Sequence, residues 1–280
     1  MAANQTFYRL LSEAIDDMME HGFDDVERLA DWQRRIREAA EKLMMPRKKM
    51  EAFLRASLRQ VFEKMVDGGK ILKRHPGVDR FTVNNLKPEL RAELDRRIMA
   101  SANLIVLNRE EAIAKTLQRF SGWATSIPIG GTDATMKAKE KENLKKAMSK
   151  LPFEERRVLI DQSHKLTSAI SEIIAQDTGA IAAIWHSHYK ESGYDYRPDH
   201  KDREVDSKKL PFVVRDNWAM KKGLMKLGGS QYVDDMTKPG EEVYCRCYYE
   251  WIYNLRDLPE QMLTEKGKEE LKRVRALRAA

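Results

Sequence analysis

The sequence has very little cysteine: its 280 residues contain only two, Cys245 and Cys247. One residue separates them, and so short a loop would strain a disulfide bridge. The composition therefore argues against a disulfide-rich secreted framework. It favours a reducing compartment, where such a pair serves as structural thiols or as metal ligands.

Long apolar runs are missing as well. No stretch of about 18 apolar residues occurs, so no membrane-spanning helix is predicted. The first residues, MAANQTFYRLLSEAIDDMME, carry early acids and lack a signal-peptide pattern, so we expect folding in a cytoplasm. We find no internal repeat, no low-complexity linker and no motif for reading nucleic-acid bases.

Charge, in contrast, is abundant, at 34% of residues with a net charge of +7 and a pI of about 9.2. This balance favours long helices with solvated faces and fits a polyanionic partner such as double-stranded DNA, bound without sequence preference. Glutamates interleave with the basic clusters at 46–49, at 137–150 and in the tail, so solvated helix faces stay an open alternative. The candidate DNA contacts are Lys145, Lys146, Lys272, Arg273 and Arg275.

Helical periodicity dominates the first part of the chain. Apolar residues recur at helical spacing through most of it, and prolines or glycines separate the segments. The predicted helices cover 7–21, 24–44, 46–67, 88–120, 134–150 and 152–176. A short strand is predicted at Phe81–Val83, inside a loop.

The amino-acid composition changes after Gly179, where Tyr, Trp, Pro and Gly become frequent. Strands are predicted at 210–214 and 241–251, a short helix at 217–229 and a basic amphipathic helix in the tail. The predicted fold class is mainly α with a small α+β C-terminal module and a long-helix N-terminal domain. The predicted domains are a helical docking domain (1–150), an α+β module (151–255) and the tail helix (256–280).

The two cysteines suggest a zinc site. Strand alternation over 241–251 would place them on one face, about 7 Å apart. His200, or the pair His186 and His188, could complete a tetrahedral set of two sulfur and two nitrogen ligands, which would staple a loop-rich module. In the competing interpretation both cysteines are small buried apolar residues and the histidines only form hydrogen bonds.

A second alternative is catalytic. His186, His188 and Asp199 follow the H-x-H-x(10)-D spacing of JAMM-type zinc peptidases, in which two His and an Asp hold zinc and an upstream Glu acts on its water. Two positions depart from that pattern, with Tyr189 in place of Pro and Tyr196 in place of Ser. The pattern should also follow a strand, whereas a long helix is predicted before it.

Five short patterns follow one another in the C-terminal half. In chain order they are Trp185-x-Ser187, Arg197-x-x-His200, an apolar segment at 211–214, Pro239-Gly240-Glu241 and Cys245-Arg246-Cys247. Over residues 155–252 this order resembles the phage Mu F-like head-morphogenesis proteins, also called minor head proteins. The motif residues carried by the resemblance are Trp185, Arg197, His200, Glu241, Cys245, Arg246 and Cys247.

The resemblance implies a structural minor head protein of a tailed bacteriophage. Such a protein is made in the host cytoplasm, lies in the virion at or near the portal and head interior, and assists head assembly and DNA packaging or delivery. Its implied partners are the portal, other head proteins and packaged double-stranded DNA, within an oligomeric particle. No enzymatic activity and no cofactor come with the family. A JAMM-like zinc hydrolase and a zinc-stapled, non-specific DNA-binding module stay as alternatives.

Overall fold

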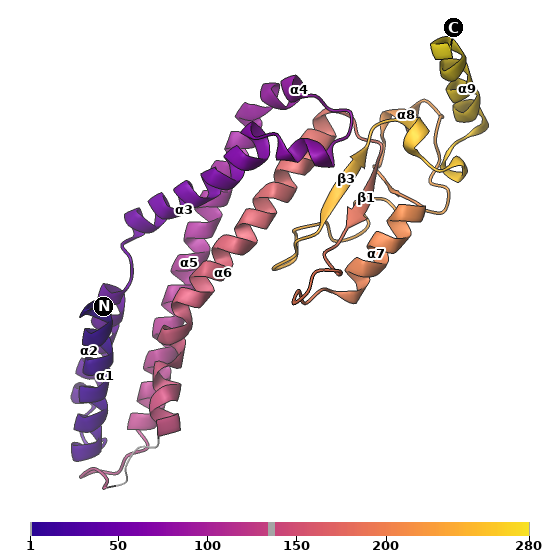
Figure 1. Cartoon of the computed structure of the whole chain (residues 1–280). Coiled ribbons are helices and arrows are strands. Elements are labelled where there is room, and N and C mark those ends of the chain that lie inside the picture. Colours follow the sequence, from indigo (N-terminus) through magenta and orange to yellow (C-terminus); the bar gives the residue numbers. More distant parts are fainter. Residues whose placement is uncertain (1, 134–137, 280) are drawn as a thin grey trace. The chain divides into compact units, whose positions relative to one another are not determined.

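The computed structural model describes residues 2–133 and 138–279. The fold is mainly helical, with a small three-stranded sheet in the C-terminal region, which confirms the predicted fold class (Figure 1). Among these residues no helix combines the length and the apolar character that crossing a membrane requires.

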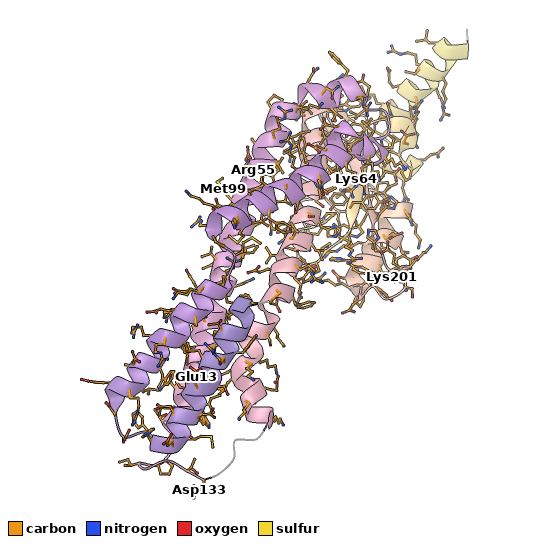
Figure 2. The ribbon with its side chains drawn as sticks, turned by 60° about the vertical axis from the view of Figure 1, so that its left-hand side comes forward. Glu13, Arg55, Lys64, Met99, Asp133 and Lys201 are labelled. Carbon is orange, nitrogen blue, oxygen red and sulfur yellow. The ribbon has the colours of Figure 1, made fainter. Side chains whose placement is uncertain are left out.

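The chain forms two compact units whose segments interleave. Unit 1 consists of Met1–Leu54 and Met99–Leu159, and unit 2 of Arg55–Ile98 and Ile160–Ala280. The sequence predicted domain boundaries after residues 150 and 255. The observed division differs because long helices contribute residues to both units. α3 passes from unit 1 into unit 2 at Arg55, and α5 passes from unit 2 into unit 1 at Met99; both residues are labelled in Figure 2.

Unit 1 is entirely helical in its described part. It contains α1 (Ala2–His21), α2 (Val26–Leu43) and parts of α3 (Arg47–Phe62), α5 (Lys87–Ala124) and α6 (Ala138–Asp177). Asp25 caps the start of α2: its carboxylate accepts a 2.8 Å hydrogen bond from the Glu27 amide and so satisfies a free donor of the first turn. The helices enclose a core that includes Phe7, Leu11, Met18, Ile36, Phe120 and Met148.

α6 is one helix where two were predicted. Residues 134–137 of the predicted lysine-rich helix lie outside the described residues, and the remainder is the first part of α6, which continues through Pro152. Pro152 costs the helix one backbone hydrogen bond. The helix continues because Leu144, Met148 and Leu151 anchor this stretch in the core of unit 1.

In unit 2, the segment between α3 and α5 consists of short helices joined by turns. It forms a π-helical turn (Glu63–Asp67), a 3₁₀ helix (Lys70–Arg74) and α4 (Arg80–Asn85). The strand predicted at Phe81–Val83 is therefore wrong. Asp79 caps α4 by accepting a 2.7 Å hydrogen bond from the Thr82 amide, and this local cap outweighs the β-propensity of Phe, Thr and Val.

The sheet of unit 2 has the order β2-β1-β3 and is antiparallel. Its strands are β1 (Ala182–His186), β2 (Phe212–Val213) and β3 (Tyr248–Ile252). The central strand β1 was not predicted, and the strand predicted over 241–251 begins only at Tyr248. Ala182 pairs with Val213 and Ile252, whereas Ala183 pairs with Phe212 and Trp251.

This alternation gives the sheet two apolar faces. One face joins Ala182, Val213 and Ile252 to the core residues Ile181, Met225, Leu258 and Met262. The other joins Ala183, Trp185, Phe212, Tyr249 and Trp251 to Ala175 and to both cysteines. The remaining elements are α7 (Pro198–Lys209), which lies beside β1 in Figure 1, α8 (Trp218–Lys221), two 3₁₀ turns (Leu255–Asp257 and Glu260–Met262) and α9 (Glu265–Ala279).

Candidate metal centre

His200 lies in the first turn of α7, a helix that the sequence did not predict. Pro198 starts the helix, where its missing amide proton costs nothing. The His200 side chain faces inward and is only 2% exposed. Its ring meets that of Trp185 edge to face, with 5.1 Å between the centroids, so β1 and α7 together hold the imidazole in place.

Cys245 and Cys247 lie in an irregular segment that leads into β3. The Cys245 amide donates to the Glu242 carbonyl over 3.1 Å, which closes a turn, and Tyr244 within it adopts a left-handed conformation with φ of 62°. The carboxylate of Asp161 on α6 accepts a 2.8 Å hydrogen bond from the Tyr244 amide. Such a conformation is strained for a residue with a side chain, so the surrounding contacts hold it there.

Gly240 allows this turn to pass close to α6. Its φ is 81°, and a Cβ atom there would lie 2.6 Å from the Ser168 hydroxyl oxygen. Only glycine meets both demands, the left-handed backbone and the missing side chain. The Pro-Gly-Glu stretch of the sequence therefore has a clear structural purpose.

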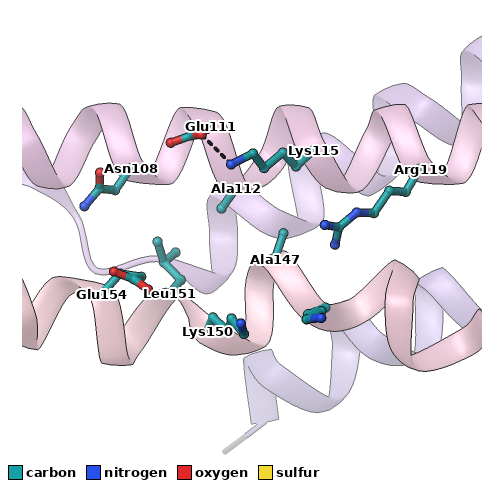
Figure 3. Close-up of a pocket in the computed structure, with 10 residues that line it drawn as sticks. Asn108, Glu111, Ala112, Lys115, Arg119, Ala147, Lys150, Leu151 and Glu154 are labelled. Carbon is teal, nitrogen blue, oxygen red and sulfur yellow. Dashed lines mark hydrogen bonds and ion pairs between the residues drawn. The ribbon is translucent and has the colours of Figure 1, made fainter. Parts of the chain in front are cut away.

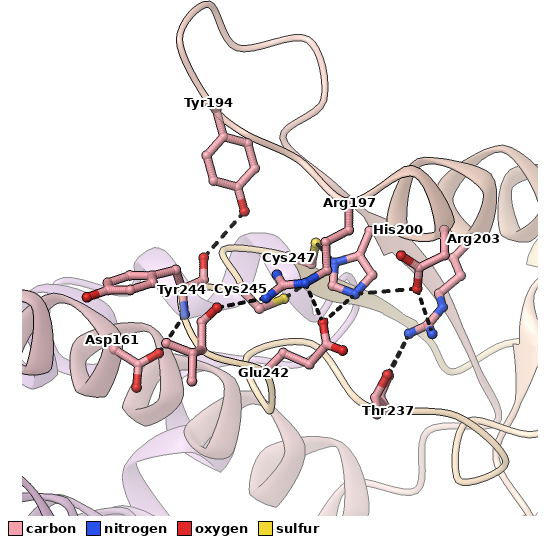
Figure 4. A network of polar contacts seen from close by, with 12 residues as sticks. Asp161, Tyr194, Arg197, His200, Arg203, Thr237, Glu242, Tyr244, Cys245 and Cys247 are labelled. Carbon is pink, nitrogen blue, oxygen red and sulfur yellow. Dashed lines mark hydrogen bonds and ion pairs between the residues drawn. The ribbon is translucent and has the colours of Figure 1, made fainter. Parts of the chain in front are cut away.

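The turn brings both cysteine sulfurs to the His200 ring (Figure 4). The Nδ1 atom of His200 lies 3.4 Å from Sγ of Cys247 and 3.8 Å from Sγ of Cys245. All three candidate ligand atoms lie within 4.8 Å of one another, and no other His, Cys, Asp or Glu group of this kind occurs in the described part of the chain. Both thiols are free and buried.

A carboxylate lies on the far side of the imidazole. The Oε2 atom of Glu242 is 3.1 Å from Nε2 of His200, and Nε of Arg197 is 2.9 Å from the same oxygen. Both of these atoms, His200 Nε2 and Glu242 Oε2, are buried and form no hydrogen bond. Arg197 also donates to the Val243 carbonyl over 3.0 Å and so ties α7 to the turn.

The two sulfurs differ in their protonation. The hydrogen bond from the Cys247 thiol lowers the pKa of Cys245 against the opposing effect of burial, and the His200 ring lowers it further. The same hydrogen bond raises the pKa of Cys247, as do burial and the Cys245 charge, while the Trp185 indole opposes them. The pair thus favours one thiolate, the form of cysteine that binds metals and attacks electrophiles.

A Cys–His–Glu array also suggests nucleophilic catalysis, but the burial argues against it. Cys245 and Cys247 are 1% and 3% exposed, and they pack in the same apolar cluster as Trp185 and Tyr249. A catalytic thiolate must be reachable by its substrate. The cluster is therefore suited to binding an ion or to plain packing rather than to attack on a substrate.

The predicted motif residues fall into two groups. Trp185, His200, Cys245 and Cys247 are buried together, with Arg197 at the edge of the cluster. Glu241 and Arg246 are exposed: Glu241 accepts a 2.8 Å hydrogen bond from the Lys238 amide, and the Arg246 guanidinium lies 5.0 Å from the centroid of the Tyr194 ring.

Arg197 pairs with Glu242, a residue outside the motif, and not with the motif residue Glu241. Both side chains of the Arg197–Glu242 pair are about a third exposed, at 38% and 34%. The tight turn at Gly240 directs Glu241 back to Lys238 and so presents Glu242 to α7.

The residues of the predicted JAMM pattern do not assemble into a metal site. His186 pairs with Glu250 at 3.0 Å, His188 with Glu191 at 2.6 Å and Asp199 with Arg203 at 3.0 Å. A strand does precede the pattern, contrary to the prediction of a helix there, because β1 ends at His186. The start of α7 at Pro198 nevertheless gives Asp199 a different partner from either histidine.

Sequence reasoning missed the residues that brace the cluster. Glu204 on α7 accepts hydrogen bonds from the amide and hydroxyl of Ser187, and the Ser207 hydroxyl accepts one from the Trp185 amide. Asp161 on α6 holds the turn. The spacing of His200, Glu204 and Ser207 along one helical face was the available signal, but it required α7 to be recognised first.

Of the candidate DNA contacts, Lys146 lines a cleft in unit 1 (Figure 3). The cleft, of about 270 Å³, lies between α5 and α6 and is lined by four basic side chains, Lys115, Arg119, Lys146 and Lys150, and by two acidic ones, Glu111 and Glu154. Lys146 and Lys150 are exposed and form no ion pair among the described residues, whereas Lys115 pairs with Glu111. Lys145 instead lies 6.0 Å from the Tyr8 ring.

The other three candidates are exposed on α9. Arg273 pairs with Glu270 at 2.8 Å, and no ion pair with a described residue forms at Lys272 or Arg275. These two side chains are free to meet an external anion, in line with a basic tail helix.

Comparisons with models of known protein families, with curated proteins and with solved structures gave no match at the significance required. We therefore infer the function from this chain's own sequence patterns and geometry.

Proposed function

We propose that this chain is a structural minor head protein of a tailed bacteriophage, acting at or near the portal in head assembly and DNA packaging or delivery. The proposal depends on two observations: the Mu F-like patterns occur in the family's order, and their central residues lie together in the structure. Trp185, His200, Cys245 and Cys247 are spread over the sequence, yet they form one buried cluster. A motif that builds a framework, without an accessible reactive group, fits a structural component better than an enzyme.

Exposed apolar side chains of unit 1 support docking onto other head proteins. Phe53, Met99, Leu107 and Phe153 are each more than half exposed, at 54%, 62%, 59% and 56%. Aromatic and methionine side chains are enriched at the centres of protein interfaces. The portal is the partner that the family resemblance favours.

The direct test is to purify particles of the phage whose genome encodes this chain and to identify their proteins by mass spectrometry. We expect the chain in the mature or precursor head, cross-linked to the portal protein. Its absence from both particles would refute the proposal.

A docking variant sharpens this test. Phe53→Asp places a charge at an exposed apolar position and should reduce co-purification with the portal by about tenfold or more, as loss of a central contact does. Leu277→Asp makes the same change at the exposed end of α9, where Leu277 is 72% exposed, and should leave co-purification unchanged.

The free cations of the cleft and of α9 support the DNA part of the proposal. Phosphate contacts make binding salt-dependent, and each one contributes about 0.9 to the slope of log K against log salt concentration. Lys146→Gln or Lys272→Gln should each lower the slope by about 1, with equal effects on unrelated DNA sequences. Lys64→Gln, at an exposed lysine that belongs to neither the cleft lining nor α9, removes the same charge and serves as the control.

A zinc-stapled DNA-binding module outside any virion is the second candidate, favoured by the clustering of His200, Cys245 and Cys247. The protein content of purified heads distinguishes the two candidate functions. DNA binding with the chain absent from heads would favour the module, whereas incorporation into heads favours the minor head protein.

A further inference from the structure

We propose that His200, Cys245 and Cys247 bind one Zn²⁺ ion that fixes the Cys-Arg-Cys turn to α7. This inference does not depend on the head-protein function, because it follows from the arrangement of the side chains alone.

The distances fit zinc geometry. Zinc–sulfur bonds of about 2.3 Å and zinc–nitrogen bonds of about 2.0–2.1 Å at tetrahedral angles separate sulfur and nitrogen by about 3.6 Å. The observed separations from Nδ1 of His200 are 3.4 Å for Cys247 and 3.8 Å for Cys245, one on each side of that value. Both sulfurs thus lie where a single ion could bind them together with the imidazole nitrogen.

The donor set favours zinc over other common ions. Thiolate sulfur and imidazole nitrogen are preferred by zinc, whereas calcium and magnesium require oxygen ligands. All three side chains are almost fully buried, with exposures of 1% to 3%. Three protein ligands leave one of the four positions to a non-protein ligand such as water, since no fourth His, Cys, Asp or Glu joins the group among the described residues.

The surroundings complete the arrangement on the opposite side of the ring. A histidine that binds metal through one nitrogen usually directs its other N–H to a carboxylate, which fixes the tautomer. Binding through Nδ1 leaves the proton on Nε2, and this atom faces Glu242 at 3.1 Å. Arg197 holds the carboxylate at 2.9 Å. The buried Nε2 and Oε2 atoms form no hydrogen bond here, although their 3.1 Å separation is within hydrogen-bond distance.

Zinc binding also sets the protonation of the two cysteines, because the metal binds thiolate sulfur. The protons that the thiols still carry would leave to solvent as the zinc–sulfur bonds form. The strained turn at Tyr244 is the local structure that such an ion would stabilise most.

The primary experiment measures metal in the whole chain, purified without chelator from cells supplied with zinc. We expect about one zinc per chain by elemental analysis, and a cobalt-substituted form with the absorption of tetrahedral, thiolate-bound Co²⁺. A strong chelator should lower Tm, and re-addition of Zn²⁺ should restore it. This arm uses the unchanged chain and does not depend on the folding of any variant.

Variants locate the site. Cys245→Ser and Cys247→Ser should each reduce bound zinc to less than about a tenth of an equivalent. Glu242→Gln should retain the ligands but weaken zinc binding by about 10–100-fold, as loss of a carboxylate behind a metal-bound histidine does. His186→Asn is the control, because His186 pairs with Glu250 outside the cluster, and its zinc content should equal that of the parent chain.

Three results would overturn the proposal. One is a parent chain with less than about a tenth of an equivalent of zinc and no change of Tm on adding Zn²⁺ or Co²⁺. Another is stoichiometric iron or copper in place of zinc. The third is full zinc content in both cysteine variants. The first of these would leave the cysteines as buried apolar residues, and none would bear on whether the chain enters phage heads.

Discussion

The two compact units bury different kinds of side chain. Unit 1 encloses leucine, isoleucine, phenylalanine and methionine between helices, with few polar groups in its interior. Unit 2 buries a larger polar set beside its sheet, including His75, Asp161, Ser171, His200, Glu204 and Ser207. Buried polar groups are costly unless they are paired, so their concentration in unit 2 identifies where a specific arrangement is maintained.

The contrast teaches how each unit achieves stability. Apolar packing in unit 1 is non-directional and tolerates exchange of one large apolar residue for another of similar volume. The network of unit 2 depends on individual donors, acceptors and backbone conformations. Single substitutions should therefore affect the two units in distinguishable ways.

The largest effect is expected from the core of unit 1. Phe120 is fully buried, so Phe120→Ala should remove about 3–5 kcal/mol from the free energy of unfolding by creating a cavity. Denaturant unfolding measures the loss, and hydrogen exchange should show it in unit 1. Phe120→Leu, which preserves most of the volume, should cost less than half as much. Equal losses for both variants would contradict a packing-based account.

Acid should destabilise unit 2 through His75. The ring lies 2.7 Å from the Tyr253 hydroxyl and 3.1 Å from the Ser171 hydroxyl, and burial, with a smaller contribution from Arg74, lowers its pKa from 6.5 to about 3. The folded state therefore resists protonation, while the unfolded state takes up a proton below about pH 6.5. Stability is present above that pH and is lost as the pH falls toward 3, by about 2 kcal/mol between pH 7 and pH 5.

The matching measurement compares the parent chain with His75→Gln in denaturant unfolding at both pH values. The variant should be less stable at pH 7 but should lack this part of the acid loss. An unchanged pH dependence would show that His75 is not the titrating group.

A smaller effect is expected at the turn before the cysteines. Gly240→Ala introduces a Cβ with a φ of 81° and a 2.6 Å approach to the Ser168 hydroxyl oxygen, and should cost about 2 kcal/mol. Gly193→Ala has a similar φ of 75° but no atom within 4 Å, so it should cost only about 1 kcal/mol. Thermal unfolding of the two variants separates the effect of the close contact with Ser168 from that of backbone strain. Equal losses of stability would show that the contact with Ser168 contributes nothing.

The smallest effect concerns the capping of α2 in unit 1. Asp25→Ala removes the acceptor of the Glu27 amide and should cost about 1 kcal/mol, whereas Asp25→Ser should cost only a few tenths. Denaturant unfolding with the m-value held fixed measures both. A loss as large for Ser as for Ala would show that the negative charge, rather than the hydrogen bond, stabilises this helix.

The sequence predicted the helical class because apolar residues repeat with helical spacing in α1, α2, α3 and α5. It did not predict β1, because Ala182 and Ala183 continue the composition of the helix before them. It also did not predict α7, whose sequence PDHKDREVDSKK has hardly any apolar stripe and is placed by polar contacts instead. Helices and strands held by such contacts leave little periodic signal.

At the site, the sequence predicted that the two cysteines meet either His200 or the pair His186 and His188. The structure brings them to His200, but for a different structural reason. An extended strand was expected to align the sulfurs, whereas a turn with a left-handed Tyr244 does so. The choice between Glu241 and Glu242 depended on that turn, and no pattern of residue types in one sequence encodes it.

The seclusion of Cys245 and Cys247 has a practical consequence. They are the only thiols of the chain, so a thiol-reactive dye has a single neighbourhood to label. In the native protein the dye can react only when that neighbourhood opens, and its labelling rate then reports the opening equilibrium of one local region without interference from the other residues. The two cysteines are thus a built-in probe of local opening at the candidate metal centre.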